Sequence, residues 1–219
     1  MKHFLVAGGV VLGLFFTTPG IAGSYDDFFL AIDKDNPELV QSLLNRGFDP
    51  NTVNPKGLPA LLQAIKTPAP RVSRILLAHP GIKVETRTPQ DESALMLAAF
   101  NGDLDLCKLL IEQEADVNKP GWTPLHYAAT NSHITVIQLL LESHAYIDAE
   151  SPNRTTPLMM AAMYGNSSAV KLLLESGADP SIKNDKGLGA LDFAEQAKKD
   201  ESAAIISAFI RAMRPKGNW

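Results

Sequence analysis

Histidine and cysteine are two residue types that can serve as general bases, nucleophiles or metal ligands near neutral pH. His126 follows a Thr-Pro-Leu segment, whereas His133 and His144 fall on different predicted elements. No carboxylate or nucleophile stands at a recurring distance from any of the three, so the spacing indicates no catalytic pair. We therefore expect no catalytic residues, and we interpret His126 as a structural residue.

The single cysteine, Cys107, excludes an intrachain disulfide, and no Cys/His spacing resembles a metal site. In the repeat described below, it shares a position with Val40, Ile137 and Val170, so we predict a small, buried, apolar side chain. The segment Gly187-Leu188-Gly189 lacks the lysine and the later glycine of a phosphate-binding loop. We expect neither a metal nor a cofactor.

The charge balance argues against general nucleic-acid binding. The 219 residues include 20 Lys and Arg and 24 Asp and Glu, a net charge of −4. Binding to a phosphate backbone needs a basic surface that displaces counterions. With 45% hydrophobic and 20% charged residues, the chain has the composition of an ordinary folded protein.

One short sequence motif recurs along the chain. Its leucine stands at Leu61, Leu95, Leu125, Leu158 and Leu191, with steps of 34, 30, 33 and 33 residues. Such a period is typical of arrays in which each unit buries its apolar face only against its neighbours. The short step of 30 predicts that the connection around residues 119–120 is clipped by about three residues.

The sequence also predicts the helices within each unit. Apolar residues at i, i+3 and i+4, such as Val170, Leu173 and Leu174, predict a second helix in every unit. We expect six units at about 24–52, 53–85, 86–118, 119–149, 150–184 and 185–211, followed by a tail at 212–219. The first and last units depart from the pattern as caps do, since they must close the core against water.

The recurring segment identifies the family that the chain resembles. Residues 123–129 read Thr-Pro-Leu-His-Tyr-Ala-Ala, and residues 156–162 read Thr-Pro-Leu-Met-Met-Ala-Ala. This motif resembles the ankyrin repeat across roughly residues 24–211. The resemblance implies an all-α solenoid of about six helix–turn–helix units, hairpin fingers, a concave helical face and protein–protein binding without common catalytic residues. It also implies that the ring of His126 ties neighbouring loops together by hydrogen bonds.

The N-terminus has the pattern of a secretory signal peptide at residues 1–22. Lys2 and His3 precede an apolar run at 4–16, and small residues follow, with Ala22 as the expected cleavage position. The run is shorter than the roughly 20 residues that span a bilayer, although an uncleaved anchor is the alternative. We predict a periplasmic protein without stable membrane insertion after cleavage, or alternatively a secreted one. Export and repeats together resemble periplasmic ankyrin proteins of Gram-negative bacteria.

Candidate partner-binding residues are large side chains outside the repeated positions. They lie at the fingers or just after the Ala pair, and they are Leu58, Phe100, Trp122, Met163 and Tyr164. The last four fall on adjacent units and could form one apolar patch for a protein partner of unknown identity, bound by a monomer. The alternatives are packing of these side chains against neighbouring fingers, a secreted effector acting on a host protein, and an enzyme.

Overall fold

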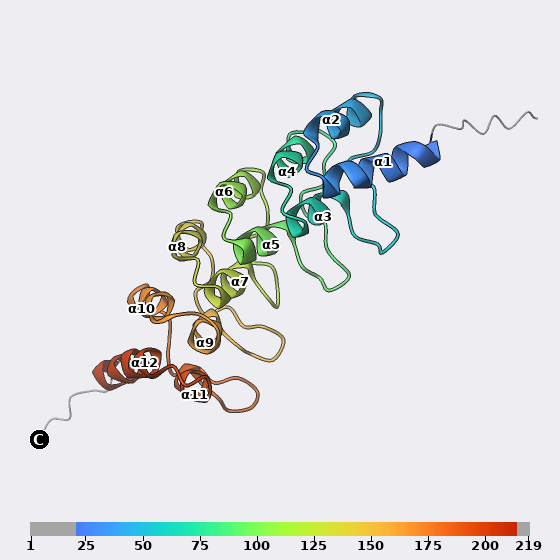
Figure 1. The fold of residues 1–219 in the computed structure, drawn as a ribbon. Coiled ribbons are helices and arrows are strands. Elements are labelled where there is room, and N and C mark those ends of the chain that lie inside the picture. Colours follow the sequence, from blue (N-terminus) through green and yellow to red (C-terminus); the bar gives the residue numbers. More distant parts are fainter. Residues whose placement is uncertain (1–20, 214–219) are drawn as a thin grey trace, which may run out of the picture.

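A computed structural model describes residues 21–213 of the chain, and in this part twelve helices pair into six units. Figure 1 shows the units stacked side by side into an elongated array, with one row of first helices and one row of second helices. The first helices are α1 (Ile21–Asp33), α3 (Ala60–Lys66), α5 (Ala94–Asn101), α7 (Pro124–Thr130), α9 (Pro157–Met163) and α11 (Ala190–Gln196). The second helices are α2 (Pro37–Asn45), α4 (Pro70–Leu77), α6 (Leu104–Glu112), α8 (Ile134–Glu142), α10 (Ser167–Glu175) and α12 (Asp200–Met213).

Local residues set where the second helices begin. Asn36, Asp103 and Asn166 each accept a hydrogen bond from the backbone N–H three residues later, at 3.0–3.1 Å. These bonds satisfy amides that lack a partner in the first turn. Pro37 and Pro70 stand in the first turn of α2 and α4, where a missing N–H costs nothing.

Four of the second helices, α2, α6, α8 and α10, are followed by a left-handed residue. Gly47 and Gly177 follow α2 and α10 with φ of +87° and +102°, a conformation in which glycine has no steric penalty. Glu114 and His144 follow α6 and α8 with φ of 62° and 65°. These two units therefore end with a residue whose Cβ makes the same turn less favourable.

The core runs continuously along the stack. The repeat leucines Leu61, Leu95, Leu125 and Leu158 are all at most 1% exposed, and neighbouring first helices pack against one another. Leu191 is only half-buried, because no further unit covers α11 on its outer side. The array thus closes its apolar interior by stacking, as the repeat predicted.

The two ends differ from the internal units. The last helix, α12, has 14 residues, whereas the other second helices have eight or nine. It extends to Met213, so the predicted tail at 212–219 starts inside a helix. The predicted signal peptide lies outside the described residues except for Ile21 and Ala22, which begin α1. Among residues 21–213, no helix has both the length and the apolar character that crossing a membrane requires.

The connections between units form the fingers, which project from the row of first helices (Figure 1). Strand pairing in the described part is limited to two isolated bridges, Val53 with Pro59 and Arg87 with Ser93. The finger at 113–123 has eleven residues, whereas the next one, at 143–156, has fourteen. The predicted clipping by three residues is therefore confirmed, and it places Trp122 on the shortest finger.

Candidate protein-binding face

His126 joins two neighbouring fingers. Its side chain is fully buried, its Nδ1 lies 3.1 Å from the backbone nitrogen of Thr123, and its Nε2 lies 2.8 Å from the carbonyl oxygen of Thr155. Burial lowers its pKa to about 4, although the bond to Thr155 acts in the opposite direction. The predicted structural role, tying loops together, is confirmed.

Cys107 is likewise a packing residue. It is fully buried on α6, and burial raises the pKa of its thiol to about 12, with a smaller contribution from the charge of Asp103. A thiol of this kind is protonated at neutral pH and is a poor nucleophile. The predicted small apolar role is therefore confirmed.

An apolar hollow of about 210 Å³ lies where the first helices α5, α7 and α9 meet the clipped finger. We call it the aromatic hollow, and its lining is Phe100, Trp122, His126, Tyr127, Thr130 and Met160. Phe100 and Tyr127 meet edge to face with ring centroids 6.0 Å apart, and Trp122 stands edge to face on His126 at 5.2 Å. These contacts fix the rings in place before any partner arrives.

A second hollow, of about 250 Å³, adjoins the first and shares two of its residues, Phe100 and Tyr127. Glu92 organises its polar side: one carboxylate oxygen lies 2.7 Å from Nζ of Lys66, and the other accepts the hydroxyl of Tyr127 at 3.4 Å. Burial and the charge of Glu92 raise the pKa of Tyr127 to about 12, so its hydroxyl keeps its proton. We call the two hollows together the inner-face groove.

The structure separates the candidate residues that the sequence grouped together. Phe100 and Trp122 line the aromatic hollow, but Met163 and Tyr164 are not among its lining residues. Tyr164 follows α9 and is 60% exposed, and Met163 is half-buried. Leu58 packs against the core and is half-buried. Of the four residues predicted to share one apolar patch, Phe100 and Trp122 line this hollow, and the partner-binding role of all five candidates stays a prediction.

Sequence reasoning missed two lining residues, Tyr127 and Met160. Each stands two positions after a repeat leucine, Leu125 or Leu158, in helices that the motif marks as core. Two positions along an α-helix correspond to a rotation of about 200°, so this side chain faces away from the buried leucine. A large side chain such as tyrosine or methionine two positions after the repeat leucine was the sequence signal that could have identified these lining residues.

The comparison with family models decides the family. The model described as ankyrin repeats (3 copies) matches residues 28–120, 69–151 and 95–184, which together cover most of the chain. The chain belongs to the ankyrin-repeat family. Ankyrin repeats are protein–protein interaction modules, and the family is generally non-catalytic.

Two relatives illustrate how the repeat is used in larger proteins. The chain is 29% identical to the nuclear factor NF-kappa-B p105 subunit of Gallus gallus over 197 residues, which is 87% of this chain and 20% of that protein. It is also 29% identical to the B-cell lymphoma 3 protein homolog of Mus musculus over 162 residues, or 71% of this chain and 36% of the relative. The chain therefore spans about a fifth to a third of these relatives.

A solved structure matches nearly from end to end. It is one chain of the complex between the predatory endopeptidase Bd0816 from Bdellovibrio bacteriovorus and the immunity protein Bd3460. The match has a TM-score of 0.72 and 26% identity, and it covers 83% of this chain and 97% of the other. A protein of this size and fold therefore occurs as one half of a protein complex.

Proposed function

We propose that this ankyrin-repeat protein is an exported binding module that holds a protein partner in its inner-face groove. The aromatic hollow is the observation that carries the proposal. Phe100 is 44% exposed although its ring is held by Tyr127, and Trp122 beside it is only half-buried. Exposed aromatic rings that are already ordered lose little entropy on binding, and such residues carry much of the energy of protein interfaces.

The shape of the hollow limits what can enter it. A volume of about 210 Å³ admits one large apolar side chain of a partner, with aromatic walls on two sides and Met160 beside them. Methionine adapts to ligands of different shape, so the wall can close on the incoming group. Filling the hollow would bury apolar surface on both proteins, and Glu92 and Lys66 in the adjoining hollow would meet polar groups next to this anchor.

Truncating the anchor residues tests the proposal. Phe100→Ala and Trp122→Ala should each weaken partner capture by about 10- to 100-fold, the usual loss at an aromatic interface residue. Tyr146→Ala is the matched control, because Tyr146 is an aromatic residue that is 68% exposed and does not line either hollow of the groove. Capture is measured against wild type at several protein concentrations, and thermal unfolding checks that each variant is folded.

Two results would reject this face as the binding site. One is unchanged capture by both groove variants when they are folded. The other is an equal loss in Tyr146→Ala, because this would place the contact elsewhere or distribute it over the whole surface.

The solved complex supports a narrower form of the proposal, in which the partner is an exported enzyme that this protein keeps inactive. One chain of an endopeptidase–immunity protein pair shares the fold over 83% of this chain. The test is inhibition: the purified protein should lower the activity of the captured enzyme in proportion to complex formed, and Trp122→Ala should relieve inhibition together with binding. Full enzyme activity in the complex would exclude the inhibitor form.

The proposal assigns no catalytic activity to the chain itself. Both ring nitrogens of His126 are occupied by hydrogen bonds to Thr123 and Thr155, and the ring is fully buried. Among residues 21–213, no group of three or more His, Cys, Asp or Glu could hold a metal ion. Hydrolysis assays with purified protein, showing turnover that survives His126→Met, would contradict this part of the proposal.

Export is the remaining part of the proposal, and it rests on the charged, apolar and small-residue segments of residues 1–22. The mature chain should begin at Gly23 and be retained in the periplasm. Fractionation of cells and N-terminal sequencing measure both points. A chain that retains Met1 in the cytoplasmic fraction would refute export, and protein in the medium would favour the secreted alternative.

A further inference from the structure

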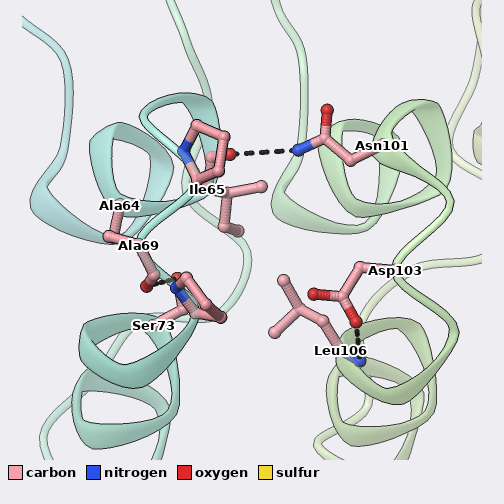
Figure 2. A pocket seen from close by; sticks show the side chains of 9 residues that line it. Ala64, Ile65, Ala69, Ser73, Asn101, Asp103 and Leu106 are labelled. Carbon is pink, nitrogen blue, oxygen red and sulfur yellow. Dashed lines mark hydrogen bonds between the residues drawn. The ribbon is translucent and has the colours of Figure 1, made fainter. Parts of the chain in front are cut away.

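A larger hollow lies on the opposite side of the first helices from the fingers, between the helix–helix turns of the second and third units. Figure 2 shows it between α3 and α4 on one side and α5 and α6 on the other. Its volume is about 350 Å³. We call it the proline-turn hollow, and its lining includes Ile65, Pro68, Pro70, Ser73, Asp103 and Leu106.

The equivalent space at the next junction is filled. There His133 reaches back to the third unit, where its Nε2 lies 2.9 Å from the carbonyl oxygen of Phe100. Its ring covers Gly102 so closely that a Cβ added to that glycine would lie 2.4 Å from Nδ1. Further along, Ser132 accepts the N–H of Asn166 across the following junction at 2.6 Å.

Asp103 holds the same repeat position as His133, but its side chain is used differently. Its Oδ1 caps its own helix by accepting the N–H of Leu106 at 3.0 Å, so it does not reach back over the second unit. Ser73 enlarges the space, because Val40 and Val170 occupy its position in the first and fifth units. A hydroxyl that donates to the carbonyl of Ala69 at 2.9 Å thus replaces a branched apolar side chain.

The hollow presents one charged atom above an apolar wall. In Figure 2 the second carboxylate oxygen of Asp103 points into the space, and it has no hydrogen-bond or ion-pair partner among the described residues. Pro68 and Pro70 contribute ring carbons and no N–H donors. The nearest basic residues in the sequence, Lys66 and Arg71, are paired with Glu92 and Glu38.

We propose that the proline-turn hollow binds a lysine side chain of a protein partner. The aliphatic stem would lie against Pro68, Pro70 and Ile65, and the ammonium would bond to the free oxygen of Asp103. Arginine fits less well, because a guanidinium is strongest on a carboxylate that offers both oxygens, and one oxygen of Asp103 is committed to the helix cap. The net charge of −4 favours approach of a basic segment.

The experiment uses the full chain and small probes. N-acetyl-lysine-N-methylamide is titrated into ¹⁵N-labelled protein, and N-acetyl-norleucine-N-methylamide serves as the matched probe with the same stem and no charge. The lysine probe should shift the backbone amides of Leu106 and Ser73, whereas the norleucine probe should cause shifts that are about 5-fold smaller at equal concentration. Equal shifts with both probes would overturn the assignment, because the carboxylate would then contribute nothing.

Asp103→Asn is a matched variant on the protein side. Asparagine caps the equivalent helices at Asn36 and Asn166, so the cap survives while the charge is removed. Affinity for the lysine probe should fall by about 2- to 5-fold, the loss expected for a partly exposed ion pair. Undiminished binding by folded Asp103→Asn would overturn the proposal.

Ser73→Val supplies a second, independent test, because it fills the hollow with the residue found at this position in other units. It should weaken the lysine probe without lowering the unfolding temperature. Trp122→Ala should leave probe binding unchanged, which separates this site from the inner-face groove. Putrescine, a small diamine, tests whether the occupant is a free molecule. If it binds more than about 10-fold tighter than the lysine probe, the hollow is a small-molecule site and the proposal of a lysine from a protein partner is overturned.

Discussion

Acidification should destabilise the array at its centre through His126. The carbonyl oxygen of Thr155 can only accept, so Nε2 carries the proton, and Nδ1 accepts the backbone N–H of Thr123. Burial disfavours the charged, doubly protonated ring, and the hydrogen bond to Thr155 offsets this only in part. The folded pKa is therefore depressed to about 4, from an ordinary value of 6.5.

The sign and size of the effect follow from linkage. Between pH 6.5 and pH 4, His126 is protonated in the unfolded chain but not in the folded chain. The free energy of unfolding therefore has its full value above the unfolded pKa and decreases as the pH falls toward the folded pKa. A difference of one between the folded and unfolded pKa corresponds to roughly 1.4 kcal/mol, so the full loss in the free energy of unfolding is about 3 kcal/mol. About 2.5 kcal/mol of this should be lost by pH ~4.5.

His126→Met is the matched variant. Methionine occupies the same position in the neighbouring units as Met96 and Met159, whose sulfur atoms accept the backbone N–H of Ser93 and Thr156 at 3.4 Å. The variant therefore keeps the acceptor for Thr123, loses the bond to the next unit and has no titratable ring. At neutral pH it should be less stable than wild type by about 1–3 kcal/mol, because the carbonyl of Thr155 loses its buried partner.

Urea unfolding of both proteins near pH 7.5 and pH 4.5 gives the measurement. Ion-paired carboxylates such as Asp192 titrate in both, so only the difference between the proteins reports on residue 126. The loss on acidification should be about 2.5 kcal/mol larger in wild type than in the variant. Equal losses, or a ring of His126 that titrates near 6.5 by NMR, would refute the reasoning.

Three further predictions concern packing. Cys107 should resist thiol reagents in the folded protein and react fully in denaturant, because burial raises its pKa to about 12. Gly165→Ala should lower the unfolding temperature by several degrees, since its Cβ would lie 2.7 Å from the carbonyl oxygen of Ala129. Asn166→Ala should cost about 1 kcal/mol of unfolding free energy in urea titrations by removing the cap of α10.

Each of these predictions has its own control. Rapid labelling of native Cys107 would show that the stack opens locally without global unfolding. Gly81→Ala should be tolerated, because only the side chain of His79 approaches its Cβ position, at 3.3 Å; equal destabilisation by both glycine variants would exclude the steric cause. Asn166→Asp keeps a cap acceptor, so it should stay near wild type, and a loss equal to that of the alanine variant would contradict the capping argument.

The sequence by itself determined the repeat, the helix starts and the structural role of the motif histidine. These features are local: a cap such as Asn166 acts on an amide three residues away, and a leucine such as Leu125 is buried wherever two units stack. Because every unit repeats the same positions, a helix or core residue that is unclear in one unit can be assigned from the equivalent positions in the others. The length of the clipped finger followed from counting residues alone.

Only the tertiary structure decided which exposed side chains meet. Phe100 and Tyr164 stand one position apart in the repeat, yet the first lines the aromatic hollow and the second does not. Met163 holds the same repeat position as Phe100 and does not line the hollow either, so the lining depends on which neighbouring helices and finger surround each position. In the same way, His133 fills its junction and Asp103 leaves a hollow, because one side chain bonds across units and the other caps its own helix.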